Sequence, residues 1–224
     1  MDIDKLIAER EVLFNSLGIS KEWFNGKRVV DVGCGTGLKS ICYNKWGSDV
    51  QALEPSQKRI AESKKNNEEF GAKVNFSSLS FWSYVPQQNF DFVACENILE
   101  YTFAPLNGIK RASRWLNENG YLFISIADKE SGTGISARRK ILRMFDGSEE
   151  EKAKTAKRLF GRYIKKISAG LGIDEEEFIK DTLLSNPYFP LRKNEMESVF
   201  GEVGLRIKSS MVKTGKMIYI LSKQ

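Results

Sequence analysis

The chain has 224 residues, 41% of them hydrophobic and 11% aromatic, and 35 Lys and Arg residues outnumber 29 Asp and Glu residues. This composition excludes a disordered chain and predicts one domain with a substantial core, while the net charge of +6 permits an anionic partner without requiring one. No apolar run approaches the roughly 18 residues of a membrane span, and the charged N-terminal stretch is not typical of a signal peptide.

The histidine and cysteine contents narrow the possible chemistry. The chain contains no histidine, which excludes mechanisms that need an imidazole, such as the Ser-His-Asp triad and the HExxH zinc hydrolases. Its cysteines, Cys34, Cys42 and Cys95, are too few and too scattered for a disulfide framework or a zinc site. We therefore expect a reduced, cytoplasmic protein without a metal, which depends on carboxylates, Tyr, Lys or Cys, or mainly on a reactive cofactor.

The first predicted element is a helix, because apolar residues recur at helical spacing from residue 3 to about residue 17 and Gly18 follows as a C-cap. Strand and helix signals then alternate, with Ser56 as the N-cap of one helix. Strands are predicted within 27–33, 49–55, 72–81, 89–97 and 121–128, and helices within 38–47, 56–71, 106–120 and 194–204. Residues 205–223 read as two strands around a turn at 213–216.

This order of elements defines the expected fold. Alternating strands and helices predict βαβ units, a parallel sheet and helices on both of its faces. The fold class is therefore α/β, with a doubly wound, seven-stranded and mostly parallel sheet that an antiparallel C-terminal hairpin closes. Residues 128 to about 190 interrupt the alternation and are predicted to form a helical insertion after the fifth strand, within a single domain spanning 1–224.

The stretch "VVDVGCGTG", residues 29–37, carries the strongest functional signal. A dinucleotide fingerprint needs its third glycine at the position of Leu38, but here the glycine stands one residue earlier, at Gly37. A P-loop is excluded because no Gly-Lys-Ser/Thr follows. The loop, with Asp31 before it, therefore suits an adenosine cofactor without a pyrophosphate. Glu54 ends the second strand, where a carboxylate can accept hydrogen bonds from ribose hydroxyls.

Four stretches in this order, "VVDVGCGTG", "ALEPS", "FDFVACENILEY" and "LNENGYLFISI", resemble successive motifs of the class I S-adenosylmethionine-dependent methyltransferases. The resemblance runs from about Lys27 to Ala127 and resumes at the terminal hairpin. It implies S-adenosyl-L-methionine as the cofactor, S-adenosyl-L-homocysteine as the product and a reversed last strand. It also implies cofactor-binding roles: the methionine part would lie on Asp31, Gly33, Cys34, Gly35 and Gly37, and the ribose on Glu54.

Two positions depart from the family pattern. Near the end of the third strand the family commonly has an Asp beside the adenine, and this chain has Ser80. Either Ser80 hydrogen-bonds the adenine amine, or Leu79 and Phe81 hold the ring by apolar contact. Many members also carry His near Asn97, whose backbone is expected to contact the methionine part.

Methyl transfer from a sulfonium is a direct in-line displacement that needs no metal, and positioning alone can supply roughly 7–11 kcal/mol. A hydroxyl acceptor additionally needs a base. Glu96, at the carboxyl edge of the fourth strand, is the first catalytic candidate, although a structural role, as an exposed loop carboxylate or a helix-capping partner, is the more common one for such a residue. Tyr101 is the second, and packing on a neighbouring helix is its alternative.

The insertion is expected to select the acceptor, since in this family such segments often form a lid. Arg138 and Arg139 in "SARRKILRMF" are candidate ligands for an anionic substrate, and Tyr188 and Arg192 are candidate pocket residues. The basic residues of 152–166 read mainly as a solvated helix face: acids open this helix, bases close it, and an apolar stripe from Ala153 to Ile167 would dock it on the body. "NPYF" at 186–189 stands too late in the chain to be an amine-binding motif.

Three hypotheses follow. The favoured one is methyl transfer to oxygen or nitrogen of a small molecule by a protein without a membrane partner. The second is the same chemistry on RNA, motivated by the basic insertion. The third is a non-catalytic partner subunit that keeps the fold, motivated by Ser80 and the missing histidine. The sequence does not name the acceptor or the oligomeric state.

Overall fold

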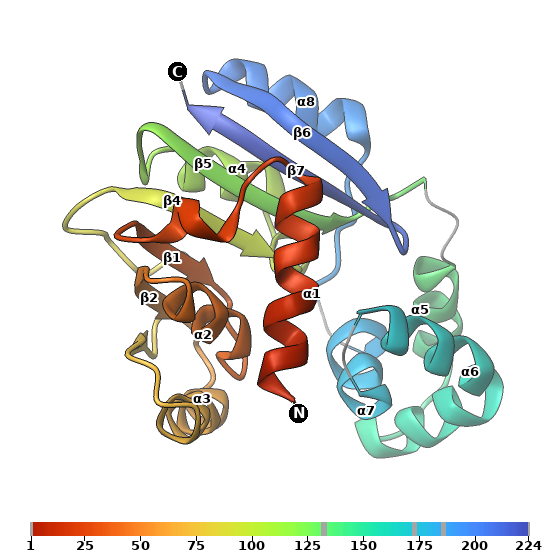
Figure 1. The fold of residues 1–224 in the computed structure, drawn as a ribbon. Helices are drawn as coiled ribbons and strands as arrows, with labels where there is room; N and C mark the ends of the chain where they lie inside the picture. The colour runs from red at the N-terminus through yellow and green to blue at the C-terminus, as the bar shows by residue number, and fades with distance from the viewer. Residues whose placement is uncertain (1, 131–133, 172–173, 185–186, 224) are drawn as a thin grey trace.

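The computed structural model describes residues 2–130, 134–171, 174–184 and 187–223. A central sheet carries helices on both faces, and a separate group of helices lies at its lower right (Figure 1). The strand order is β3-β2-β1-β4-β5-β7-β6, as expected for the predicted doubly wound sheet. The strands are β1 (Arg28–Val32), β2 (Asp49–Leu53), β3 (Asn75–Ser77), β4 (Phe90–Glu96), β5 (Leu116–Ala127), β6 (Leu205–Lys213) and β7 (Lys216–Lys223).

Strand direction follows the prediction. β1 pairs in parallel with β2 and β4, and β4 pairs in parallel with β5. β7 is antiparallel to both β5 and β6. Between β6 and β7, Thr214 and Gly215 both have positive φ, 51° and 72°, as a two-residue hairpin turn matching the sheet twist requires. This turn brings the start of β7 to the edge where β1 and β4 end.

The helices of the body are α1 (Ile3–Ser16), α2 (Leu38–Lys45), α3 (Gln57–Glu69), α4 (Pro105–Ser113) and α8 (Lys193–Glu202), with short helices η1 (Lys21–Phe24) and η2 (Leu99–Tyr101). Residues of α1 and α2 pack with one face of the sheet, and residues of α4 and α8 pack with the other. Phe14 anchors α1: it is fully buried, and its ring contacts Phe24, Tyr43, Trp46, Phe92 and Phe123. A burial of this size is worth several kcal/mol and fixes α1 beside the sheet edge.

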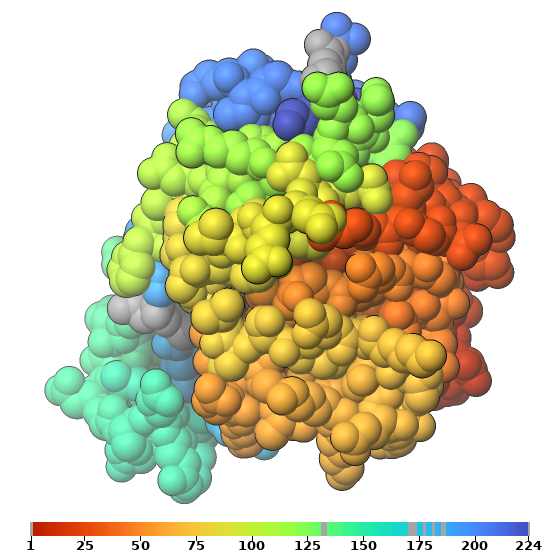
Figure 2. Space-filling view, turned by 90° about the vertical axis from the view of Figure 1, so that its left-hand side faces the viewer, coloured from red at the N-terminus to blue at the C-terminus, as the bar shows by residue number. Residues whose placement is uncertain are grey.

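The interval after β5 holds α5 (Ile135–Arg143), α6 (Glu149–Leu171), α7 (Glu175–Glu177) and the π-helical η3 (Phe178–Leu184). Ser148 and Glu151 form a capping box at the start of α6. At the start of α7, the N–H of Glu176 donates to the Asp174 carboxylate at 2.8 Å. In Figure 2 these helices (teal) project from one lower corner of the molecule.

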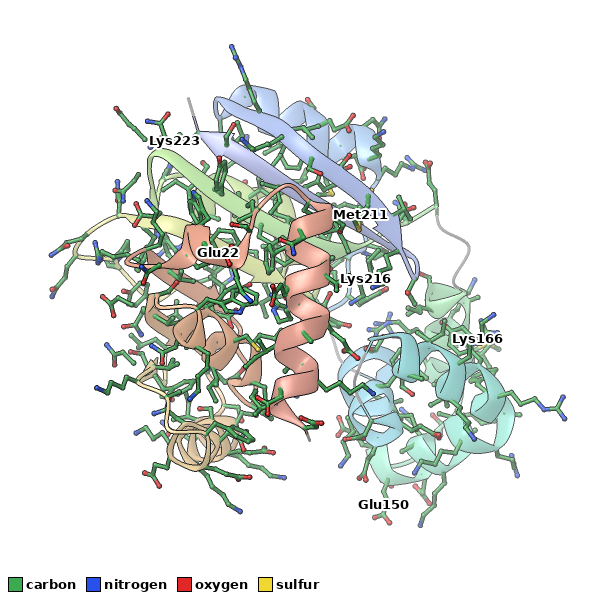
Figure 3. All side chains as sticks on the ribbon, viewed as in Figure 1. Glu22, Glu150, Lys166, Met211, Lys216 and Lys223 are labelled. Atoms are coloured by element: carbon green, nitrogen blue, oxygen red, sulfur yellow. The ribbon has the colours of Figure 1, made fainter. Side chains whose placement is uncertain are left out.

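Two expectations about α6 are wrong. Its apolar stripe does not dock on the sheet; Ala156 and Ile164 pack with Phe178 and Ile179 in a cluster belonging to the insertion itself. The helix also continues past the last lysine to Leu171, so its final turn has no basic residue and the dipole argument for a basic C-terminus fails. The exposed bases of α6 are instead spread along its outer side, as Lys166 illustrates (Figure 3).

The sheet differs from expectation in two details. β3 is only three residues long and ends before Ser80. β5 begins at Leu116 and includes the expected turn, with Asn119 at a φ of 62°. Within the described residues, no helix combines the length and apolar content that crossing a bilayer requires.

Candidate active site

A cleft of about 580 Å³ lies at the carboxyl edge of the sheet. Its walls come from the loops after β1 and β4, from α1, from the β6–β7 turn and from the insertion. Seven residues singled out from the sequence line it: Asp31, Gly33, Cys34, Gly35, Glu96, Asn97 and Tyr101. Arg10, Lys39, Thr182 and Lys216 also line it and were not singled out as site residues. The other candidates lie outside this lining, as the described residues define it.

Each glycine of the loop after β1 has positive φ, but the surroundings of Gly35 and Gly37 differ. Gly33, Gly35 and Gly37 have φ of 71°, 58° and 78°. A Cβ at Gly37 would lie 2.7 Å from the Phe76 ring and 2.8 Å from Cβ of Ser63, so this glycine permits close packing of the loop on β3 and α3. A Cβ at Gly35 would meet no described atom within 4 Å. Gly35 therefore faces open space in the cleft, where a ligand can approach the backbone.

Glu54 ties this loop to the end of β2. Its carboxylate accepts from the N–H of Gly35 at 3.1 Å and from the N–H of Ser56 at 2.9 Å, and the residue is 5% exposed. A carboxylate has about four acceptor positions, so two remain for ribose hydroxyls. Glu54 thus serves the loop's conformation as well as the expected ribose contact.

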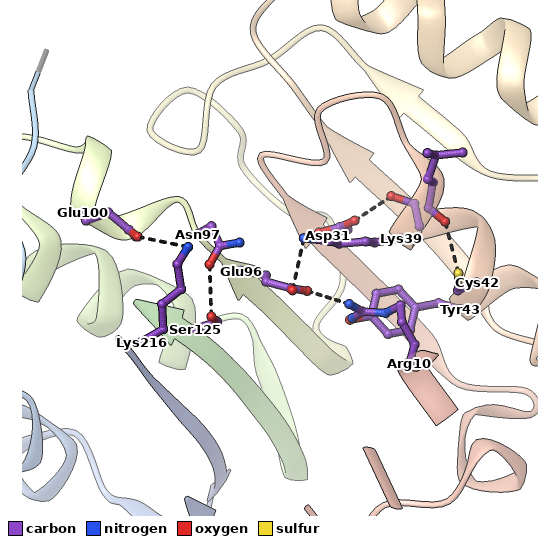
Figure 4. Close-up of polar contacts among 12 residues, drawn as sticks. Arg10, Asp31, Lys39, Cys42, Tyr43, Glu96, Asn97, Glu100, Ser125 and Lys216 are labelled. Atoms are coloured by element: carbon purple, nitrogen blue, oxygen red, sulfur yellow. Dashed lines mark hydrogen bonds and ion pairs between the residues drawn. The ribbon is translucent and has the colours of Figure 1, made fainter. Parts of the chain in front are cut away.

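Asp31 and Asn97 face the cleft from the ends of β1 and β4. The buried Asp31 carboxylate accepts from Ser40 Oγ at 2.6 Å; burial raises its pKa, and Ser40 and Lys39 oppose that rise. Asn97 has a φ of 59°, donates its N–H to the Ser125 carbonyl at 2.8 Å and accepts from Ser125 Oγ at 3.0 Å (Figure 4). A left-handed backbone conformation costs a non-glycine residue about 1–3 kcal/mol. The two hydrogen bonds with Ser125 hold Asn97 in this conformation.

The three residues predicted to contact the adenine, Leu79, Ser80 and Phe81, have different surroundings and do not form one site. Phe81 is 5% exposed and packs edge-on against Trp115, so it belongs to the core and is not available to an adenine ring. This corrects its expected role, and the short β3 is the reason. Ser80 exchanges hydrogen bonds with Ser83, and Leu79 is exposed.

Glu96 is surrounded by cations (Figure 4). Its carboxylate lies 2.9 Å from the Arg10 guanidinium and 3.1 Å from Lys39 Nζ. Burial alone would raise the pKa of Glu96, but Arg10 and Lys39 outweigh it and lower the pKa to about 2. A carboxylate held so firmly ionised is a weak proton acceptor, and this geometry does not support Glu96 as the general base. The Arg10 guanidinium also donates to the Tyr43 hydroxyl at 2.6 Å.

Tyr101 lies deeper in the same cleft. Its hydroxyl is 3.2 Å from Thr182 Oγ1 of η3, and its ring centre is 5.6 Å from that of Tyr188. Burial raises the pKa of Tyr101 well above its usual range, so the hydroxyl stays protonated and can donate but not act as a base at neutral pH. Tyr188 shares a smaller cavity with Tyr101, Thr182 and Lys216.

The arginines proposed for substrate binding are held elsewhere. Arg138 stacks 3.6 Å from the Tyr163 ring centre and donates to the Gly134 carbonyl. Arg139 is 4% exposed, donates to the Thr182 carbonyl and lies over the Tyr188 ring. Arg192 is an exposed residue at the start of α8, 3.4 Å from Glu130. All three expectations need correction, because the guanidinium groups join helices of the insertion or lie on the surface instead of facing the cleft.

The sheet order, the glycine loop and the carboxylate that ends β2 together define a class I methyltransferase fold. The family model described as a methyltransferase domain matches residues 7–163. This is well over half of the chain, which therefore belongs to that family of S-adenosylmethionine-dependent methyltransferases.

Curated relatives include the ubiquinone biosynthesis O-methyltransferase of Actinobacillus pleuropneumoniae serotype 7, 29% identical over 110 residues (46% of this chain and 47% of that protein). That of Dechloromonas aromatica is 33% identical over 106 residues (46% of each). The chain thus matches about half the length of these relatives.

Solved structures that share the fold include the two that follow. Magnesium protoporphyrin IX methyltransferase from Synechocystis, with bound S-adenosylhomocysteine, has a TM-score of 0.63 and 17% identity, covering 99% of this chain and 82% of that one. A methyltransferase from Clostridium acetobutylicum has a TM-score of 0.63 and 12% identity, covering 100% and 92%.

The residues present fit the family's cofactor. The open space at Gly35, the oxygens of Asp31 and the left-handed backbone of Asn97 all face one cleft, and its volume suits a nucleoside-sized ligand. Asp31 offers a negative charge where the cofactor's cationic methionine part is expected.

Proposed function

We propose that this protein transfers a methyl group from S-adenosylmethionine to oxygen or nitrogen of a small molecule. The observation that supports this most is that one continuous cleft is lined both by the glycine loop with Asn97 and by Tyr101, Thr182 and Lys216. A cofactor and an acceptor bound in this cleft would be adjacent, as an in-line displacement needs. The names of the relatives, O-methyltransferases of ubiquinone biosynthesis and a magnesium protoporphyrin IX methyltransferase, support a small-molecule acceptor.

When bound, the cofactor supplies an electrophilic methyl group on a positively charged sulfur. The protein's part is positioning. Gly33, Cys34 and Gly35 would hold the methionine part, with Asp31 and Asn97 beside it, and Glu54 would hold the ribose. The Arg10–Glu96–Lys39 cluster fixes α1 against α2 and β4 and forms one wall. The insertion, through Ala169 and Thr182, forms the opposite wall and would exclude water from the acceptor.

Calorimetric titration tests the cofactor. The wild-type protein should bind S-adenosylmethionine with micromolar affinity and NAD not measurably. Glu54→Gln keeps an acceptor for the Gly35 N–H but loses the charge, and should weaken binding about tenfold or more, since a hydrogen bond to a charged group is worth about 1.5–3 kcal/mol. Binding of NAD instead, or unchanged affinity in the variant, would refute the assignment.

RNA is a second acceptor class, favoured by the exposed cations along α6 at Lys157, Arg158, Arg162, Lys165 and Lys166. Binding through phosphates predicts an affinity that falls steeply with salt. Titrations with single-stranded RNA at low and at physiological salt decide between the two acceptor classes. Weak binding whose affinity does not fall steeply with salt would count against RNA and favour the small-molecule acceptor. Methyl transfer to any acceptor would eliminate a non-catalytic partner subunit.

A further inference from the structure

A buried carboxylate that the cofactor does not need borders a smaller cavity beside the cleft. Glu100 in η2 has a fully buried side chain. One of its oxygens, Oε1, accepts from the N–H of Ala127 at 3.2 Å, whereas Oε2 is buried without a hydrogen-bond partner among the described residues. An unsatisfied oxygen on a buried carboxylate is costly, so a protein that keeps one invites a functional explanation.

Lys216 stands between Glu100 and the cleft. It is the first residue of β7, its side chain is 11% exposed, and Nζ lies 3.9 Å from Glu100 Oε1 (Figure 4). Lys216 lines the cleft together with Tyr101 and Thr182, whereas Glu100 borders only the smaller cavity behind it, as the described residues define both. Figure 3 shows Lys216 near the β6–β7 turn, on the side of the sheet that faces the insertion. The ammonium can therefore contact an acceptor that Glu100 cannot reach.

The electrostatics of the pair favour proton exchange. Burial raises the pKa of Glu100, and Lys216 opposes that rise. Burial lowers the pKa of Lys216; Glu100 and Glu96 oppose that change, and Lys39 adds to it. The pKa values of Glu100 and Lys216 are thus closer to each other than those of a glutamate and a lysine in water. Glu96 differs, because its pKa is lowered and it stays ionised.

We propose that Lys216 binds the hydroxyl oxygen that receives the methyl group and relays its proton to Glu100, and that the acceptor is a phenol. This inference rests on the proposed methyltransferase function. A phenol is the hydroxyl class that matches the relay, because its pKa of about 10 lets it lose its proton far more readily than an alcohol does. The ring of Tyr101 lines the cleft together with Lys216, and that of Tyr188 packs against it in the smaller cavity. Lys216 is then the catalytic residue, and Glu100 acts through it.

The step balances. The acceptor oxygen forms a bond to the methyl carbon as the carbon–sulfur bond breaks. The electron pair of the broken carbon–sulfur bond stays on the sulfur of S-adenosylhomocysteine. The hydroxyl proton passes to Lys216 Nζ, which gives one of its own protons to the Glu100 carboxylate. Lys216 ends as an ammonium and Glu100 as a neutral acid, which returns the proton to water through Lys216 after product release.

The test uses two probes, catechol, which is un-ionised at neutral pH, and 4-nitrocatechol, whose nitro group leaves one hydroxyl largely ionised at pH 8. Glu100→Gln keeps an acceptor for the Ala127 N–H but cannot take a proton. It should lower kcat for catechol about 100-fold, the lower range for a proton acceptor, and kcat for 4-nitrocatechol less than about threefold. Lys216→Met should raise KM for both probes and, because it breaks the relay, should also lower kcat for catechol about 100-fold. Lys110→Met, which removes an exposed lysine paired with Glu202, is the control for a lost charge.

Equal losses with both probes in Glu100→Gln would assign Glu100 a structural role and overturn the relay. The melting temperatures of both single variants and of Glu100→Gln/Lys216→Met separate such a role from misfolding, because the double variant leaves no unpaired buried charge. If the wild-type protein binds S-adenosylmethionine but methylates neither probe, the phenol relay is overturned and the cofactor assignment stands. If it does not bind the cofactor at all, the proposed function itself fails.

Discussion

The ion pair between Arg10 and Glu96 should decide how firmly α1 is attached. The two side chains are 4% and 14% exposed, and the pKa of about 2 for Glu96 compares with an ordinary value of about 4.3. That difference corresponds to about 3 kcal/mol of stability at neutral pH. Arg10→Met removes the main cation and leaves Glu96 with Lys39. Because breaking a buried pair costs about 3–5 kcal/mol and Lys39 remains, we expect a loss near 3 kcal/mol.

Urea unfolding followed by tryptophan fluorescence measures this loss. Glu96→Gln should cost a similar amount, and the double variant should cost less than the sum of the two single losses, since the residues share one interaction. The pKa of Glu96 is depressed in the folded protein, so its stabilisation is complete above about pH 5 and is lost as pH falls toward 2. Glu96→Gln should therefore lack this acid dependence, and Arg10→Met, which keeps Glu96 beside Lys39, should weaken it. Lys110→Met is the exposed-pair control, with an expected change of at most about 0.5 kcal/mol; an Arg10→Met loss no larger than this would refute the reasoning.

The remaining predictions concern the loop and the core. Gly37→Ala should destabilise the protein by about 2–4 kcal/mol, because its Cβ would overlap Phe76 and Ser63 at positive φ, whereas Gly35→Ala should cost only about 1–2 kcal/mol of backbone strain. In a calorimetric titration, Gly35→Ala should bind the cofactor at least tenfold more weakly than the wild-type protein. Equal stability losses in the two variants would contradict the assigned roles. Phe14→Ala should cost about 3–5 kcal/mol in the same urea assay, and a loss below about 1 kcal/mol would show that α1 is not anchored through this ring.

Much of the fold could be predicted from the sequence because its signals are local. Val29, Val30 and Val32 form a buried strand, Ser56 caps α3, and Thr214 with Gly215 makes the hairpin turn. Each of these features depends on residues adjacent in the chain. The glycine spacing was informative for the same reason, since it encodes a backbone path.

The errors arose where residues distant in the chain meet. Arg10 and Glu96 are 86 positions apart, and nothing near either residue indicates that a helix at the N-terminus supplies the partner of a β4 carboxylate. The apolar stripe of α6 was recognised, but periodicity does not say which surface covers it, and η3 does so. Arg139 is a candidate substrate ligand on the sequence because its carbonyl partner, Thr182, is 43 positions away and its aromatic partner, Tyr188, is also distant in the chain. Glu100 and Lys216 were overlooked because the hairpin alone brings them together.

A crystal structure of the protein with S-adenosylhomocysteine tests the central claim most directly. The account predicts the homocysteine part between Gly33, Gly35 and Asn97, the ribose hydroxyls on Glu54, and the sulfur facing the end of the cleft that Tyr101 and Lys216 line. A ligand at another position, or one whose sulfur faces away from Lys216, would contradict the arrangement on which the proposed function and the acceptor site both depend.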